Sequence, residues 1–439
     1  MSSVKFHPVY KILYTGILSI LLIWIAAEGF DLRSPSPDAP YLSNIYAFSF
    51  ELGGNPWQTP EAWIDSWFFN APPPFKYRLL GKLPIYITYH FLLSNGFDKL
   101  IALYAAYTLW TGLFLFTFLW SAARFCECFI GYANRQGFKI FFLSSTLIAL
   151  SAPVFWAFKF PVHGSPNDFL GYTLISLALI ALMKNHLFWF LVFCMAGIFC
   201  RETCLIVLLP FCLNKNIGIT RKLGNILLLA IIFICYRHLW PGYYNPFDGA
   251  KLNWRFPLES LSFLFLTFGP FWLTSFIGYQ LICIHTKDDN IKAFNFSFMP
   301  AVITVLVVVF LLARVREIRI EFILFAYFIP YSVFYIQQRH KEIISFIFSI
   351  AGLIATIAVA LILVRVYFIF TPITVIKHQA LLQLFNHFYT GFGGGWIKQF
   401  LAYLAVFLFL LFFELTKLVR IYQYKKNLPQ HKIKGNTRP

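Results

Sequence analysis

The stretch GIFCRETCLIVLLPF, residues 197–211, sets two charged residues, Arg201 and Glu202, inside an otherwise nearly apolar run. One charged side chain at the centre of a bilayer costs roughly 2.5–3.5 kcal/mol on insertion scales, so a neighbouring pair needs polar surroundings. The flanking runs, 187–200 and 203–213, are shorter than a full helical crossing. Short paired helices are tolerated where their turn lines a cavity inside the protein. We therefore expect a helical hairpin whose turn faces a polar chamber, with a purely structural ion pair as the alternative.

The whole chain has the composition of a membrane protein. Of its 439 residues, 59% are hydrophobic and only 12% are charged, and Phe alone occurs 54 times. Runs such as 223–235 and 343–364 are continuously apolar, without the alternation of a membrane β-barrel. The predicted fold class is an all-α polytopic membrane protein. The net charge of +18 does not indicate a nucleic-acid partner, because excess Lys and Arg in a membrane protein usually mark cytoplasmic loops.

The apolar runs predict about 12 transmembrane helices. Their approximate ranges are 12–27, 100–122, 140–157, 169–183, 187–200, 203–213, 223–238, 261–284, 298–313, 320–336, 343–366 and 398–417. With this layout, twenty of the 36 Lys and Arg residues share one side with both termini and with only five acidic residues. That side is predicted to be the cytoplasm. The eight cysteines show neither a disulfide framework nor a zinc-binding spacing, so no metal ligands are predicted.

A long outside loop, 28–98, follows the first span. It ends in the segment 74–93, which is too basic and too rich in tyrosine to cross the bilayer, and which we expect to lie in the outer interface. The charged residues in unusual places all fall on this outer side: Asp31, Asp38, Lys76, Arg78, Asp168, Arg201, Glu202, Arg316, Glu317 and Arg319. Arg and Lys beside a membrane cavity bind phosphate, and a carboxylate can deprotonate an attacking hydroxyl. Together they suggest a sugar carried on a lipid phosphate as the substrate.

The order of these segments resembles the GT-C superfamily of membrane glycosyltransferases, which includes aminoarabinose transferases and protein O-mannosyltransferases. The segments that carry the resemblance are DLRSPSPDAPY (31–41), KYRLLGKLP (76–84), SPNDFLGY (165–172), RETCL (201–205) and REIRIEF (316–322). They cover residues 1–335, which would form the catalytic module. Residues 336–418 would add further transmembrane helices, and 419–439 a basic cytoplasmic tail.

The resemblance implies transfer of a sugar from a polyprenyl-phosphate donor to a glycan, lipid or protein acceptor at the outer face of a bacterial inner membrane. It implies Asp38, or else Asp31, as the catalytic base. Arg201, Arg316, Arg78 and Lys76 would hold the donor phosphate, with Asp168, Glu202, Glu317 and Arg319 in support. Many members of the superfamily use a divalent metal, but the chain has no clear Asp-Asp or Asp-x-Asp motif at this place, so no cofactor is assigned.

Two other functions fit a chain of this kind. A lipid-linked glycan polymerase or ligase usually carries its large outside loop late in the chain, whereas the late loop here, 367–397, is shorter than 28–98. A transporter or flippase often has two similar halves with broken spans, and no half repeat is visible. Membrane lipids are expected partners under every one of these hypotheses.

Overall fold

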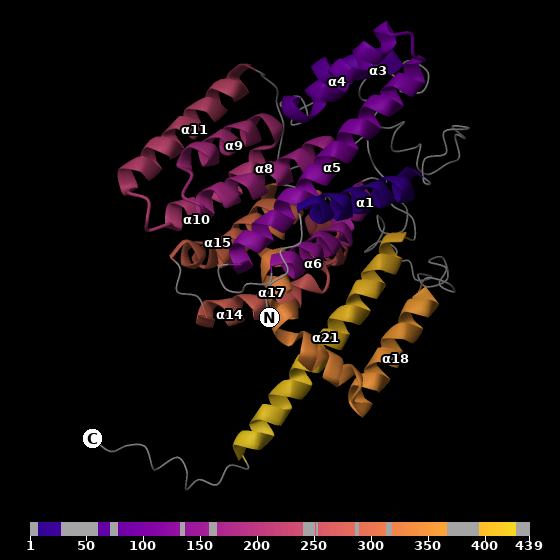
Figure 1. Ribbon diagram of the computed structural model, residues 1–439, viewed down its shortest axis with the longest axis vertical. Helices are drawn as coiled ribbons and strands as arrows, with labels where there is room; N and C mark the ends of the chain where they lie inside the picture. Colours follow the sequence, from indigo (N-terminus) through magenta and orange to yellow (C-terminus); the bar gives the residue numbers. More distant parts are fainter. Residues whose placement is uncertain are drawn as a thin grey trace.

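The computed structural model describes residues 8–27, 60–70, 78–131, 137–157, 165–239, 251, 253–285, 289–312, 318–366 and 395–426. All regular structure in these ranges is helical, which confirms the all-α class (Figure 1). The first half contains α1 (Pro8–Ala27), α3 (Pro60–Asp65), η1 (Ser66–Asn70), α4 (Leu79–Ser94), α5 (Lys99–Gly131), α6 (Gly137–Ala149), α7 (Ala152–Ala157), α8 (Ser165–Met183), α9 (Leu187–Cys200), η4 (Glu202–Val207) and α10 (Leu208–Leu213). The second half contains α11 (Ile219–Leu239), α13 (Pro257–Phe268), α14 (Phe271–His285), α15 (Asp289–Leu312), α16 (Ile318–Glu321), η5 (Phe322–Leu324), α17 (Phe325–Ile347), α18 (Ile350–Val364) and α21 (Gly395–Lys426).

Several of these helices are suited to a bilayer. In the described part of the chain, four are long and apolar enough to cross a membrane: Lys99–Gly131, Ile219–Leu239, Asp289–Leu311 and Lys398–Ile421. Two bent pairs, Pro257–Phe268 with Phe271–Ile284 and Phe322–Ile347 with Ile350–Val364, raise the number to six if each pair is one span. Five further apolar helices are shorter. The chain is therefore an all-helical integral membrane protein, while helix length alone does not establish twelve spans.

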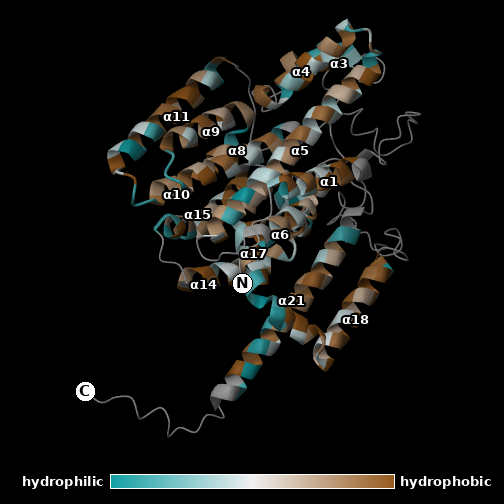
Figure 2. Cartoon of the chain, in the orientation of Figure 1, coloured by the Kyte–Doolittle hydropathy of each residue, from teal (hydrophilic) through white to brown (hydrophobic). Residues whose placement is uncertain are grey.

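Hydrophobic side chains on the outer surface agree with this environment. Figure 2 shows hydrophobic residues along most of the outward-facing helices, including α18 and much of α11. Phe348 and Ile350, at the bend between α17 and α18, are 82% and 83% exposed, and Ile284 at the end of α14 is 77% exposed. A surface with so many exposed large apolar side chains is stable in hydrocarbon and not in water.

The helix boundaries differ from the predicted spans at two breaks. The predicted span 261–284 is split by a 57° bend, where Gly269 has φ +51° and is followed by Pro270, which cannot donate a helical hydrogen bond. Conversely, the predicted break between 336 and 343 is wrong, because α17 runs on to Ile347. Arg339 and Glu342 remain on the helix and form an ion pair one turn apart. The chain turns by 94° only after Ile347.

The interior is built from closely packed helices. A Cβ atom on Gly278 of α14 would lie 2.0 Å from the carbonyl oxygen of Tyr331 on α17, so only glycine allows the observed approach of these two helices. Small residues at helix contacts serve the same purpose in membrane bundles generally. The central pair α5 and α8 is joined by aromatic contacts such as that between Phe118 and Tyr172, whose ring centroids are 5.1 Å apart.

The helix ends gather into two groups, which we name the site end, where α8 begins, and the opposite end, where α8 finishes. At the opposite end, the side-chain amide of Asn290, at the start of α15, donates to the Met183 carbonyl at the end of α8. Asn214, just after α10, donates to the same Asn290 side chain. At the site end lie the end of α9, the start of η4, the end of α11 and the start of α4, which carry the charges described next.

Candidate functional site at one end of the bundle

The turn between α9 and η4 is formed by a single extended residue. Arg201 has φ −163° and ψ 124°, and its N–H donates to the Gly197 carbonyl at 2.6 Å, so that α9 ends there. Glu202 then starts η4, and the N–H of Cys204 donates to the Arg201 carbonyl at 3.0 Å. A Cβ atom on Gly197 would lie 2.7 Å from the Cβ of Cys204, so a side chain there would push the two short helices apart. The predicted hairpin with a buried turn is confirmed.

Arg201 does not pair with its neighbour Glu202. It forms a hydrogen-bonded ion pair with Asp168, in the first turn of α8, and each side chain is only 2% exposed. A carboxylate in the first turn also interacts favourably with the helix dipole. The expectation that this Arg faces a polar chamber is not met; the structural alternative describes it better, with Asp168 in place of Glu202.

Contacts on both sides of the ion pair fix the start of α8 in the bundle. The Gly81 N–H of α4 donates to Asn167 Oδ1 at 3.1 Å, and the Cys200 thiol donates to the Asn167 carbonyl at 3.1 Å. Gly171, one turn further along α8, leaves room for the stem of Arg201, since a Cβ there would lie 3.6 Å from Arg201 Cβ. Three helices therefore determine where the Arg201 guanidinium and the Asp168 carboxylate meet.

Glu202 points to a different set of cations. Its Oε1 lies 3.6 Å from Nη2 of Arg78 and 3.6 Å from Nη2 of Arg237. Arg78 directly precedes α4 and is buried, whereas Arg237 lies in the last turn of α11, a favourable place for a cation. Glu202 is 32% and Arg237 28% exposed. We name Arg78, Asp168, Arg201, Glu202 and Arg237 the arginine cluster; its outer part, around Glu202, is accessible.

Lys82 adds a further cation beside the cluster. It follows Arg78 by one helical turn, on the same face of α4, and only 1% of its surface is exposed. Helix α4 is not among the candidate membrane spans. Burial and the neighbouring positive charge of Arg78 lower the pKa of Lys82 from 10.5 to about 7.

The segment that carries REIRIEF reaches the same end of the bundle. Glu321 is 1% exposed and its Oε2 accepts a hydrogen bond of 2.6 Å from the Thr267 hydroxyl of α13. The following helix η5 contacts η4. The predicted residues Asp31, Asp38, Lys76, Arg316 and Glu317 lie outside the described residues, as does the side chain of Arg319. Of the predicted site residues, the structure thus brings Arg78, Asp168, Arg201 and Glu202 together.

A cavity of about 340 Å³ starts at Glu202 and Thr203 and follows η4 and α10. One wall contains Leu205, Leu208 and Leu209, and the other contains Val305, Val308 and Val309 of α15. Ile320 and Ile323 line it as well, so η4, α10, α15 and the REIRIEF segment share this cavity. Its lining is almost entirely aliphatic, and its polar residues include the pair at the site end.

Sequence reasoning missed Arg237, Lys82, Glu321 and the cavity as parts of this region. Arg237 carried a usable signal, because it follows the apolar run 223–235 at the predicted outer end of a span. Lys82 was part of a segment treated as interfacial, and nothing in the sequence indicated its burial. The cavity is formed by residues roughly a hundred positions apart, so no local pattern could reveal it.

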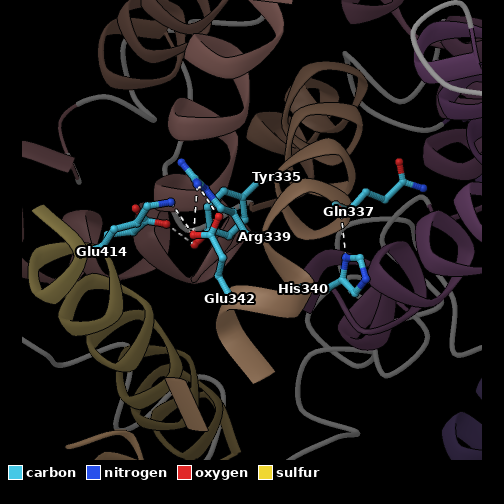
Figure 3. Close-up of polar contacts among 7 residues, drawn as sticks. Tyr335, Gln337, Arg339, His340, Glu342 and Glu414 are labelled. Atoms are coloured by element: carbon cyan, nitrogen blue, oxygen red, sulfur yellow. Dashed lines mark hydrogen bonds and ion pairs between the residues drawn. The ribbon is translucent and has the colours of Figure 1, made fainter. Parts of the chain in front are cut away.

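A second polar cluster lies at the opposite end and holds α21 against α17 (Figure 3). The Tyr335 hydroxyl donates to Glu414 Oε1 at 2.7 Å. Glu342 accepts from Arg339 at 2.9 Å and pairs with Lys417 of α21. Glu342 is 44% exposed, and the contacts are explained by helix packing. We therefore place the candidate functional site at the arginine cluster.

The donor set at the arginine cluster is suited to an anion. Within the described part of the chain, no group of three or more His, Cys, Asp or Glu side chains could hold a metal ion. The guanidiniums of Arg78 and Arg237 and the ammonium of Lys82 favour phosphate. No known family model, curated protein or solved structure matches this chain.

Proposed function

We propose that the protein is a membrane glycosyltransferase that moves a sugar from a polyprenyl-phosphate donor to an acceptor at the outer face of the membrane. The observation that carries the proposal is the accessible part of the arginine cluster, where two guanidiniums share one carboxylate oxygen at the end of an aliphatic cavity. A lipid phosphate has the matching chemistry, an anionic head on a hydrocarbon chain. Ionisable groups at membrane depth are costly and are functional candidates for that reason.

The proposed chemistry divides the work among several residues. An acceptor hydroxyl attacks the anomeric carbon of the sugar while the bond from that carbon to the phosphate oxygen breaks, and polyprenyl phosphate leaves with the bonding electrons. Asp38, with Asp31 as the alternative, accepts the hydroxyl proton. Arg78 and Arg237 stabilise the charge that develops on the leaving phosphate. Lys76 and Arg316 remain candidate phosphate ligands, with Glu317 and Arg319 as supporting residues.

Arg201 receives a different role in this proposal. Because it is paired with Asp168 and buried, it positions the adjacent Glu202 and does not contact the donor. Glu202 in turn orients Arg78 and Arg237. The proposal therefore moves direct phosphate binding from Arg201 to the more accessible cations.

The proposal includes an arrangement in the membrane. The site end faces outward, both termini are cytoplasmic, and the membrane is the bacterial plasma membrane. Twelve crossings would result if each short helix is part of a span. This sidedness is supported by the charges, because the opposite end gathers basic residues such as Lys11, Arg124 and Lys417, in accord with the positive-inside rule.

A transfer assay tests the proposed function. The full chain would be reconstituted in liposomes with a panel of radiolabelled polyprenyl-phosphate sugars and a crude membrane acceptor fraction. Release of free polyprenyl phosphate and movement of label to the acceptor are expected. Asp38→Asn should reduce the rate by roughly 10²–10⁴, the usual contribution of a general base, while Asp31→Asn tests the alternative base.

The same assay separates the other functions. If no donor in the panel reacts with folded protein, the glycosyltransferase proposal fails. If labelled lipid instead crosses the bilayer without cleavage, a flippase is the better description. If both Asp variants keep rates within tenfold of the unsubstituted protein, neither carboxylate is the base.

A further inference from the structure

The cavity between η4–α10 and α15 has the dimensions of a site for one hydrocarbon chain. From Glu202 to Cys212, its lining follows ten residues, which span about 17 Å at the rises of a 3₁₀-helix and an α-helix. Spread over that length, 340 Å³ corresponds to a cross-section of about 20 Å². One extended hydrocarbon chain fills such a section, and two side by side do not fit.

The cavity is open along the side formed by exposed residues and closed behind. Val308 is 40% exposed at the rim, whereas Val305, Val309 and Ile323 form a floor that is 4%, 0% and 4% exposed. A chain could therefore enter sideways from the bilayer and be covered on its inner side by aliphatic groups. Such covering improves van der Waals contact over that in fluid lipid, because protein packing is denser.

The polar end of the cavity has the charges that a phosphate head requires. Glu202 lies there, and the guanidiniums of Arg78 and Arg237 approach within 3.6 Å of it. Neither contact is short enough for a hydrogen bond. The hydroxyl oxygen of the neighbouring Thr203 is buried and has no hydrogen-bond partner in the described part of the chain. A headgroup oxygen at this position would satisfy that hydroxyl.

We propose that this cavity is the binding site for the hydrocarbon chain of a single-chain lipid phosphate, with the phosphate beside Thr203 and Arg237. The inference rests on the proposed function for the choice of a polyprenyl chain, but the site itself is argued from the cavity and its polar end. Ordinary phospholipids carry two chains and would place only one of them in the groove, so they should bind less well.

Photo-crosslinking tests the site without requiring transfer. The purified full chain in nanodiscs would be irradiated with a polyprenyl phosphate that carries a diazirine on its chain, and the labelled peptides would be identified by mass spectrometry. Label is expected on residues 202–212 and 304–309. Unlabelled polyprenyl phosphate should compete, whereas polyprenol, which lacks the phosphate, and phosphatidylglycerol, which has two chains, should compete weakly.

Two neighbouring valines on α15 provide a matched pair of variants. Val308→Trp would fill the cavity, while Val307, which is 49% exposed, does not line it. Val308→Trp should lower labelling about tenfold, corresponding to loss of one well-covered stretch of chain, and Val307→Trp should leave it unchanged. Both variants should elute as folded protein in size-exclusion chromatography, and Ile323→Trp offers a second block from the floor.

Each outcome bears on one of the two proposals. Equal labelling of the Val308 and Val307 variants, or equal competition by phosphatidylglycerol, would overturn the groove and would indicate ordinary bilayer lipid. If transfer occurs while the groove is not labelled, the glycosyltransferase proposal survives and the groove does not. If the groove is labelled specifically but no sugar is transferred, the lipid site stands and the enzymatic function fails.

Discussion

Breaking the Asp168–Arg201 ion pair should reveal how strongly the site end depends on it. The two side chains are each 2% exposed, so solvent does not screen the interaction. Removing one partner of such a pair strands the other charge and typically destabilises a protein by about 3–5 kcal/mol. Replacing both partners by apolar residues of similar volume is often nearly neutral. The expected pattern is therefore two damaging single substitutions and a much milder double one.

The two single substitutions should not be equal. Arg201→Met leaves Asp168, which can become neutral by taking up a proton, and it keeps the aliphatic stem that packs near Gly171. Asp168→Leu leaves a guanidinium that cannot lose its charge in a protein. We expect a loss of about 3 kcal/mol for Arg201→Met and about 5 kcal/mol for Asp168→Leu, the two ends of the usual range. The double variant should recover most of that loss.

The assay is the free energy of unfolding in mixed micelles, followed by circular dichroism during titration with a denaturing detergent. The exposed pair Lys99–Glu61 serves as a control, since its side chains are 58% and 47% exposed and Lys99→Met should cost at most about 1 kcal/mol. Additive losses in the double variant would refute the reasoning, because they would show that the two charges do not stabilise one another. Normal lipid-phosphate binding by a folded double variant would support the positioning role of Arg201.

Three further predictions concern the same region. Lys82 carries its charge only below a pKa of about 7, so binding of polyprenyl phosphate should weaken between pH 6 and pH 8, and Lys82→Met should remove this dependence; because an unfolded Lys keeps its proton up to about 10.5, the same group should make the folded state more stable as the pH rises from 7 to 10.5, which thermal unfolding at several pH values would check. Gly81→Ala would place a Cβ 2.4 Å from Asn167 Oδ1 and should cost about 1–3 kcal/mol by overpacking, whereas Gly16→Ala, which meets no atom within 4 Å, should be neutral in the same unfolding measurement. Single cysteines introduced at Ser66 and Asn134 in a cysteine-free background should react with impermeant thiol reagents from opposite sides of the membrane, outside and cytoplasmic respectively; reaction from one side would contradict the proposed sidedness.

The sequence was sufficient for the fold class and for the hairpin around residue 201, because both depend on local patterns. Apolar runs of helical length predict helices wherever they occur, and a charged pair between two short runs predicts a turn within the protein. The helix at 74–93 is also observed, as Leu79–Ser94. Its buried face, with Lys82, was not predictable from its composition, because contact with α8 and α9 decides which cations are covered.

Helix breaks show where local reasoning was incomplete. The Gly-Pro pair at 269–270 is a recognised breaking signal, yet the apolar character of the whole stretch suggested one continuous span. Around residue 339 the opposite happened, since polar side chains suggested a loop. The helix continues because Arg339 pairs with Glu342, Glu342 with Lys417, and Tyr335 with Glu414. Those partners lie on α21, about 75 residues away, and only the tertiary structure brings them close.

The pairing of Arg201 illustrates why adjacent charges can have separate roles. The extended backbone of Arg201 directs its side chain inward to Asp168, and Glu202, the first residue of η4, faces Arg78 and Arg237. The inner charge is neutralised within the protein, so it stabilises the turn without needing water or ligand. The outer charge is shared between two cations at the end of an aliphatic cavity, where a second anion would balance it. A single dipeptide thus joins the packing of α8 to the surface at which we propose that a lipid phosphate binds.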